Sequence, residues 1–224
     1  MARGTLLLHG HADGADMYDP TTLLLFLAAA AAIAVSPGPG MLYVASRTLA
    51  GGRGEGMAST LGTGIGGLVH VLAGAVGISV LIAASAMAFT ALKLAGGLYL
   101  VWLGIRTFRG ATLAVPTAAA TGSRRALREG IVVEATNPKT AAFFLAFLPQ
   151  FVDPAGGSAA LQFLVLGAVS VGLNTAVDAG VVVAATRIRN AVLAAPRLMR
   201  RVQQGSGAIL TALGLSLLLA RRPA

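Results

Sequence analysis

Three polar side chains are spaced along one long apolar segment in the C-terminal half of the chain. Ser170, Asn174 and Asp178 follow one another at intervals of four residues, so they share one face of a helix. An ionisable group inside a membrane-spanning helix is costly and faces a cavity or a partner. Asp178 is therefore a candidate for carrying a coupling proton, and Asn174 for binding a substrate. The alternative for Asp178 is a structural pair with a neighbouring Lys or Arg.

His70 is the only ionisable group in the long uncharged run from Met57 to Leu92. It lies on a helical face of small residues, which allows close packing of helices. Two interpretations follow: a structural histidine that hydrogen-bonds across a tight interface, or a member of a proton relay. The face consists of Thr63, Gly67, His70, Gly74 and Gly77.

Lys139 directly follows Pro138, and Glu134 precedes that proline by about one helical turn. A lysine at a helix break could bind a substrate carboxylate, or it could pair with Glu134 or Asp178. Glu134 is a second candidate for proton coupling. Its alternative is a place at the membrane interface.

Two apolar segments are interrupted by proline in matching positions. The first, which begins near Thr21, is broken by a Ser-Pro-Gly-Pro-Gly run, and the second is broken at Pro138. A proline removes a helix hydrogen bond, and lipid cannot satisfy the freed backbone groups, so a break is tolerated where protein or a water-filled cavity meets it. Paired breaks point to a transporter site at the membrane midplane, whereas kinks in a packed bundle are the alternative. The predicted substrate ligands at the breaks are Ser36, Pro37, Gly38, Pro39, Gly40, Asn137, Pro138 and Lys139.

The overall composition excludes a water-soluble fold. Of the 224 residues, 56% are hydrophobic and only 11% are charged, against about 25% charged in a typical soluble domain. The mean hydropathy of +0.79 also excludes a disordered chain. The chain has no cysteine and three histidines, so we expect no thiolate metal site, no cofactor and no zinc enzyme.

These elements predict an all-α integral membrane protein with six transmembrane helices in two inverted three-helix repeats, the first helix of each repeat being broken by Pro and Gly. Three spans are an odd number, so the second repeat inserts upside down relative to the first. The predicted divisions are a polar segment (1–19), a first repeat (20–109), a cytoplasmic linker (110–128) and a second repeat (129–224). Glycine pairs such as Gly62 and Gly66 are interpreted as packing positions; small-residue faces also permit a homodimer.

The basic residues are distributed unevenly between the two sides of this arrangement. The loops after the first, third and fifth predicted spans carry most of the arginines. The opposite side carries only Arg3, Arg221 and Arg222. Because basic loops stay in the cytoplasm beside anionic lipid, we expect both termini outside and no nucleic-acid partner. The basic loops carry Arg47, Arg53, Arg106, Arg109, Arg124, Arg125, Arg128, Arg187, Arg189, Arg197, Arg200 and Arg201.

The N-terminal segment is a poor match to a signal peptide, because the flank of its apolar run is acidic and prolines follow immediately. Residues 1–16 differ from the rest of the chain, and Met17 stands just before the first span. We therefore predict Met17 as the natural start.

Several longer stretches resemble the lysine exporter and homoserine-threonine exporter (LysE/RhtB) translocator family. They are SPGPG through MLYVASRTLAGGRGEG, LGTGIGGLVHVLAGAVG, LKLAGGLYLVWLGIRTFRG and REGIVVEATNPKTAAFFLAFLPQFVDP, and the likeness as a whole extends in order over about residues 20–222. The resemblance implies proton-driven export of amino acids or related metabolites from the bacterial cytoplasm, through six spans in two inverted halves. The family's motif residues fall on Pro37, Gly38, Pro39, His70, Asn137, Pro138 and Lys139.

This chain departs from the family pattern at two positions. Gly40 stands where many members have Asn, and Gly67 stands where many carry an Asp shortly before the histidine, which shifts the expected proton-coupling role to Asp178.

We expect a secondary exporter of the bacterial inner membrane whose partners are a small-molecule substrate, protons and lipid. The alternatives are a cation or metal-ion exporter and a passive facilitator or channel. An intramembrane enzyme would need a nucleophile–base pair or a metal triad, and a sequence with one histidine in its spans and no cysteine offers neither.

Overall fold

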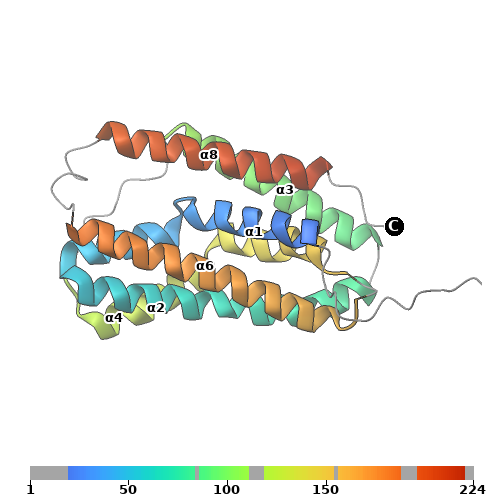
Figure 1. Ribbon diagram of the computed structural model, residues 1–224, viewed down its shortest axis with the longest axis horizontal. Helices are drawn as coiled ribbons and strands as arrows, with labels where there is room; N and C mark the ends of the chain where they lie inside the picture. Colours follow the sequence, from blue (N-terminus) through green and yellow to red (C-terminus); the bar gives the residue numbers. More distant parts are fainter. Residues whose placement is uncertain (1–19, 84–85, 111–118, 154–155, 188–195, 220–224) are drawn as a thin grey trace, which may run out of the picture.

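The computed structural model describes residues 20–83, 86–110, 119–153, 156–187 and 196–219, and most of these residues lie in helices. The long helices run roughly along one common axis (Figure 1). The polar segment 1–19 with Met17, part of the basic loop after Arg187, and the closing Arg221 and Arg222 lie outside the described residues. The elements are α1 (Pro20–Val35), α2 (Pro39–Ala83), α3 (Ala86–Phe108), α4 (Ser123–Ala135), α5 (Pro138–Ala142), η1 (Phe143–Phe147), η2 (Leu148–Phe151), α6 (Ala159–Arg187) and α8 (Pro196–Leu219).

The helices have the length and composition of membrane spans. Four apolar segments are long enough to cross a bilayer by themselves: Pro39–Gly77, Thr90–Phe108, Ala159–Arg187 and Arg200–Leu219. A fifth crossing is available if Ser123–Ala135 and Pro138–Phe151, which meet at an angle of 41°, count as one bent span. Helix α1 is apolar but has only 16 residues. The prediction of an all-helical membrane protein is confirmed.

The helix α2 contains a sharp kink. Gly52 has φ 75° and ψ −167°, which are not helical values, and a positive φ favours glycine because it has no Cβ. A Cβ on Gly56 would contact the Thr48 side chain, so the segments on either side of the kink pack against each other. The segment of 45 residues is therefore two helical pieces that meet at a kink at Gly52.

The predicted breaks occur where the prolines stand. Helix α1 ends at Val35 and α2 begins at Pro39, and α4 ends at Ala135 before α5 begins at Pro138. Helix α4, however, begins at Ser123, inside the range 110–128 that was predicted as linker. The carboxylate of Glu55 explains this start, because its Oε1 accepts the backbone N–H groups of Thr121 (2.8 Å) and Gly122 (2.7 Å).

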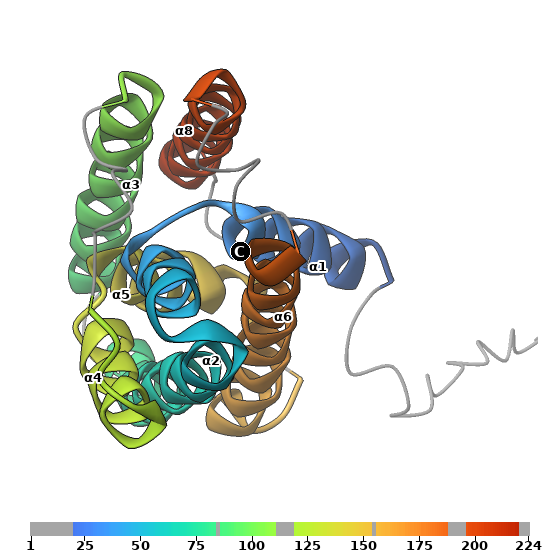
Figure 2. The ribbon, with the colours of Figure 1, turned by 90° about the vertical axis from the view of Figure 1, so that its left-hand side faces the viewer.

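The helices form two groups with α1 between them. Helix α2 packs against both α4 and α6, and α3 packs against α8 at the opposite edge (Figure 2). Helix α1 contacts α6, α8 and η2. The buried core around α1 is rich in aromatic side chains: Phe26, Phe143, Phe144, Phe147 and Phe163.

Glycines bring helix backbones into close contact. Inside a lipid bilayer no hydrophobic effect drives helices together, so close packing has to hold them. A Cβ on Gly66 would lie 2.5 Å from the carbonyl oxygen of Ile131, so α2 and α4 meet backbone to backbone. A Cβ on Gly214 would lie 2.7 Å from the backbone nitrogen of Val101, so α8 and α3 do the same. Small residues allow this approach between membrane helices. The interpretation of Gly62 and Gly66 as packing positions agrees with these contacts.

Candidate functional site

The two broken helices meet through one lysine. The Lys139 Nζ, at the start of α5, donates hydrogen bonds to the carbonyl oxygens of Ile33 (3.2 Å) and Ser36 (2.8 Å) at the end of α1. Lys139 is only 6% exposed. A Cβ on Gly38 would lie 3.0 Å from Lys139 Cε, so the two breaks lie directly against each other.

The local sequence explains why these carbonyls are available. The last carbonyls of a helix have no partner within that helix. Pro37 and Pro39 carry no N–H, so the chain after α1 cannot continue the hydrogen-bond ladder. Ser36 N donates one bond to the Ile33 oxygen at 3.2 Å, and Lys139 Nζ donates a second bond to Ile33 and one to Ser36. We call the carbonyl oxygens of Ile33 and Ser36 the carbonyl site.

Glu134, at the end of α4, collects hydrogen bonds from the second break. Its Oε1 accepts from Thr140 Oγ1 (2.6 Å), and its Oε2 accepts from Asn137 Nδ2 (2.9 Å). The Asn137 Oδ1 accepts from Lys139 N (3.0 Å) and caps α5. A Cβ on Gly40 would collide with the Glu134 carboxylate, so the glycine at the start of α2 leaves room for this acid. Glu134 itself is buried within the protein.

His70 joins the same region from α2. Its Nε2 lies 2.9 Å from the carbonyl oxygen of Glu134 and, because a carbonyl only accepts, Nε2 carries a proton. The imidazole stacks on Phe144 with ring centroids 6.0 Å apart. One of the two interpretations of His70 was a structural histidine that hydrogen-bonds across a helix interface. The structure shows such a hydrogen bond, from α2 to the end of α4.

Asp178 lies on α6 and is 1% exposed. Its Oδ2 accepts a hydrogen bond from Thr63 Oγ1 at 3.0 Å, whereas Oδ1 is buried with no hydrogen-bond partner in the described structure. Among the described residues, Glu129 forms ion pairs with Arg47 and Arg125, whereas no ion pair joins Asp178, Glu134 or Lys139 to a charged partner. The alternatives in which Asp178 pairs with Lys or Arg, or Lys139 pairs with Glu134 or Asp178, are therefore not seen within ion-pair distance.

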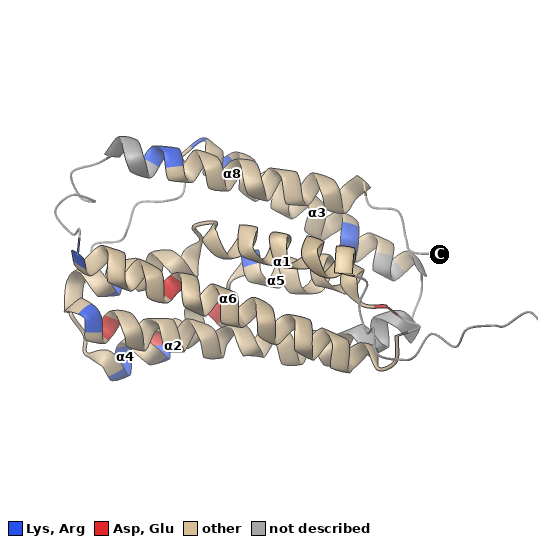
Figure 3. Ribbon diagram, viewed as in Figure 1, with Lys and Arg blue, Asp and Glu red and all other residues tan. Residues whose placement is uncertain are grey.

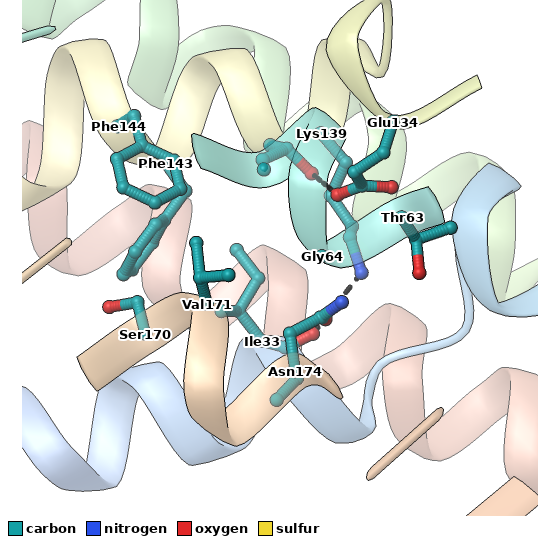
Figure 4. Close-up of a pocket in the computed structure, with 13 residues that line it drawn as sticks. Ile33, Thr63, Gly64, Glu134, Lys139, Phe143, Phe144, Ser170, Val171 and Asn174 are labelled. Atoms are coloured by element: carbon teal, nitrogen blue, oxygen red, sulfur yellow. Dashed lines mark hydrogen bonds between the residues drawn. The ribbon is translucent and has the colours of Figure 1, made fainter. Parts of the chain in front are cut away.

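A pocket opens beside these groups, between α1, α2, α5, η1 and α6 (Figure 4). It measures about 410 Å³ with its open mouth included. One wall is polar and carries Lys139 and Glu134, and the aromatic rings of Phe143 and Phe144 lie at the other end. The remaining lining residues are Ile33, Ala34, Thr63, Gly64, Gly67, Thr140, Ser170, Val171 and Asn174.

The predicted site residues divide into those that line this pocket and those that support it. Lys139, Asn174 and Glu134 line it. The remaining predicted residues lie behind these three or at the two breaks. Pro39 and Pro138, which begin α2 and α5, are exposed. The supporting set is Ser36, Pro37, Gly38, Pro39, Gly40, Asn137, Pro138, His70 and Asp178.

The sequence reasoning did not assign several lining side chains to the site, among them two threonines and two phenylalanines. Thr140 stands next to Lys139 and bonds Glu134 across the break, which its place directly after the lysine could have suggested. Thr63 was noted only as a member of the small-residue face. Phe143 and Phe144 carried no signal beyond apolar character. Among the described residues, no group of three or more His, Asp or Glu stands together as a metal site requires.

A helical membrane protein in which two broken helices meet beside a pocket with one polar wall has the architecture of a membrane transporter. The chain belongs to the LysE-type translocator family, whose model matches residues 31–221. It is accordingly a multi-pass bacterial membrane transporter and not an enzyme. No solved structure matches the chain at a significant level.

Named relatives support this assignment. An uncharacterized membrane protein of Vibrio cholerae is 34% identical over 200 residues, which cover 88% of this chain and 97% of the relative. A homoserine/homoserine lactone efflux protein of Salmonella typhimurium is 34% identical over 200 residues, covering 88% and 95%. A leucine efflux protein of an Enterobacter species is 29% identical over 144 residues, covering 63% and 68%.

Proposed function

We propose that this protein is a secondary exporter of amino acids in the bacterial inner membrane, driven by the proton gradient. The observation that carries the proposal is the contact of the two breaks through Lys139, beside a pocket that holds a buried acid. Backbone carbonyls at a broken helix are ligands for a cation, and an amino acid carries an ammonium group. The efflux activities named for the relatives point to the same class of cargo.

The ammonium group is the feature that such cargo shares. Homoserine has a free carboxylate, whereas its lactone has none, yet both appear in the name of one relative. Glu134 lines the pocket and Asp178 lies just behind Thr63, so the acids surround the place where a cation would bind. Recognition in this protein therefore centres on the amino end of the substrate.

Six crossings in two inverted repeats fit the helix lengths. A helix of 16 residues spans about 24 Å, which is short for about 30 Å of hydrocarbon. Joined across the first break to the part of α2 before Gly52, α1 completes one crossing, and the rest of α2 provides the next. Most Lys and Arg lie toward one end of the bundle (Figure 3), which we place in the cytoplasm with both termini outside.

Proton coupling is assigned to Asp178, with Glu134 as a second acid at the pocket. A buried carboxylate with one unpartnered oxygen can take up a proton and release it when water reaches it. His70 holds the end of α4 and links this region to the pocket wall. During transport the two repeats would rock against each other, so that the pocket faces each side of the membrane in turn.

The test uses inverted membrane vesicles, in which export appears as uptake. Vesicles with the protein, energised to an acidic interior, should accumulate leucine or homoserine against its gradient, and a protonophore should abolish the accumulation. Vesicles without the protein are the control. Uptake that only equilibrates across the membrane would identify a passive facilitator and contradict the proposal.

A further inference from the structure

The ammonium group of Lys139 already occupies a site suited to an ammonium ligand. Its Nζ donates hydrogen bonds to both oxygens of the carbonyl site, to Ile33 at 3.2 Å and to Ser36 at 2.8 Å. These oxygens lie at the negative end of the α1 dipole. Ile33, which supplies one of these oxygens, also lines the pocket, so the carbonyl site borders the space that a substrate would enter. The bound group belongs to a tethered side chain instead of a free molecule.

We propose that Lys139 is an internal competitor for the substrate, and that the substrate ammonium replaces Lys139 Nζ at the carbonyl site. This inference rests on the proposed function and deepens it, because it names the ligand class as compounds with a primary ammonium group. In the empty protein Lys139 keeps the two carbonyls hydrogen-bonded, which a membrane interior requires. In the loaded protein the substrate makes the same bonds.

Lys139 has further acidic groups near its ammonium, besides the carbonyl site. Its stem lies against Gly38, where a Cβ would come within 3.0 Å of Cε, so the first break is shaped around this side chain. Glu134 and Asp178 both lie close enough to act electrostatically on the Lys139 ammonium. The buried Oδ1 of Asp178 has no hydrogen-bond partner in the described structure, so an acceptor for a displaced or incoming cation is present.

The segment that carries Lys139 also has unusual helix geometry. Helix α5 has five residues, is preceded by a break and continues into the π-helical turn η1 and the 3₁₀ turn η2. Such turns are less regular than an α-helix and are frequent at functional sites. A small shift of α5 would withdraw Lys139 Nζ from the carbonyl site without breaking a long helix.

The experiment measures binding to the purified protein by calorimetry, with two probes that separate the ends of an amino acid. Leucine methyl ester has the ammonium group without a carboxylate, and N-acetylleucine has the carboxylate without an ammonium group. In Lys139→Ala the competitor is gone, so the ester should bind at least about tenfold more tightly than to the wild type. N-acetylleucine should bind neither protein.

Two further arms control for charge and for folding. Propylammonium replaces the atoms that Lys139→Ala lacks, so it should bind and stabilise this variant but not the wild type. Lys139→Arg keeps the cation and should retain the weak binding of the wild type, and Lys139→Gln serves as the neutral variant if the alanine variant does not fold. Arg53→Met, which removes an exposed cation, should leave binding unchanged.

The outcomes separate this inference from the proposed function. Ester binding that is unchanged or weaker in folded Lys139→Ala, or in Lys139→Gln, would overturn the competitor role even when vesicles accumulate amino acids. If vesicles accumulate none while propylammonium binds Lys139→Ala selectively, the exporter proposal fails and the carbonyl site remains a site for ammonium groups.

Discussion

The Lys139 Nζ lies 2.8 Å from the carbonyl oxygen of Ser36, although the two residues are 103 positions apart in the chain. This hydrogen bond joins the break in the N-terminal half to the break in the C-terminal half. It uses a cation to satisfy the end of one helix and anchors that cation on the first turn of another. The polar groups that line the pocket are arranged around it.

Replacing Asp178 by asparagine should separate binding from proton coupling. Asn keeps the size of the side chain and can still bond Thr63, but it cannot exchange a proton at neutral pH. We expect gradient-driven accumulation in inverted vesicles to fall to the level of vesicles without the protein. Exchange of labelled for unlabelled amino acid without a gradient should persist. Asp178→Glu, which keeps the carboxyl group, should retain part of the driven accumulation, and full accumulation by Asp178→Asn would exclude the coupling role.

Substituting Gly40 should disturb the fit of Glu134 at the second break. A Cβ at this position would collide with the Glu134 carboxylate, and overpacking typically costs about 1–3 kcal/mol. Gly40→Ala should therefore lower the midpoint of thermal unfolding. Gly77→Ala in the same helix, where a Cβ would meet nothing within 4 Å, is the matched control and should be close to neutral.

A double-variant cycle identifies the cause of that effect. In a Glu134→Ala background the colliding carboxylate is absent, so Gly40→Ala should cost much less than in the wild type. Equal costs in the two backgrounds would show that Glu134 is not the group that Gly40 accommodates.

The α3–α8 contact should depend on one glycine and not on its neighbour. A Cβ on Gly207 would collide with the backbone of Phe108, whereas a Cβ on Gly205, two residues earlier, would meet nothing within 4 Å. Gly207→Ala should destabilise the protein by about 1–3 kcal/mol, and Gly205→Ala should be neutral or slightly stabilising. Thermal unfolding of both variants in the same detergent measures the difference, and equal midpoints would contradict this packing.

The proposed orientation can be tested with single cysteines, because the natural chain has none. Ser123, at the start of α4, and Ser158, just before α6, are both exposed. A membrane-impermeant maleimide added to intact spheroplasts should label Ser158→Cys but not Ser123→Cys. Inverted vesicles should give the opposite pattern. Labelling of Ser123→Cys from outside would reverse the assignment of the two termini.

The sequence by itself determined the features that depend on local backbone chemistry. Proline has no N–H, so the breaks at Pro37 and Pro138 could be placed without a structure, as could the apolar helices between them. It also indicated the polar face of α6, because a spacing of four residues is a property of any helix. The start of α4 at Ser123 was missed, since it depends on Glu55, which lies 67 residues before Gly122.

Only the tertiary structure decided which polar groups meet. Thr63 and Asp178 are 115 residues apart, and the sequence contains no signal that pairs them. The partners considered for Lys139 were acids, whereas its hydrogen bonds go to backbone carbonyls, which every residue has and which no motif can mark. Those carbonyls accept bonds from Lys139 because packing brings α5 against the end of α1. At that end the helix has no further N–H groups of its own to donate to them.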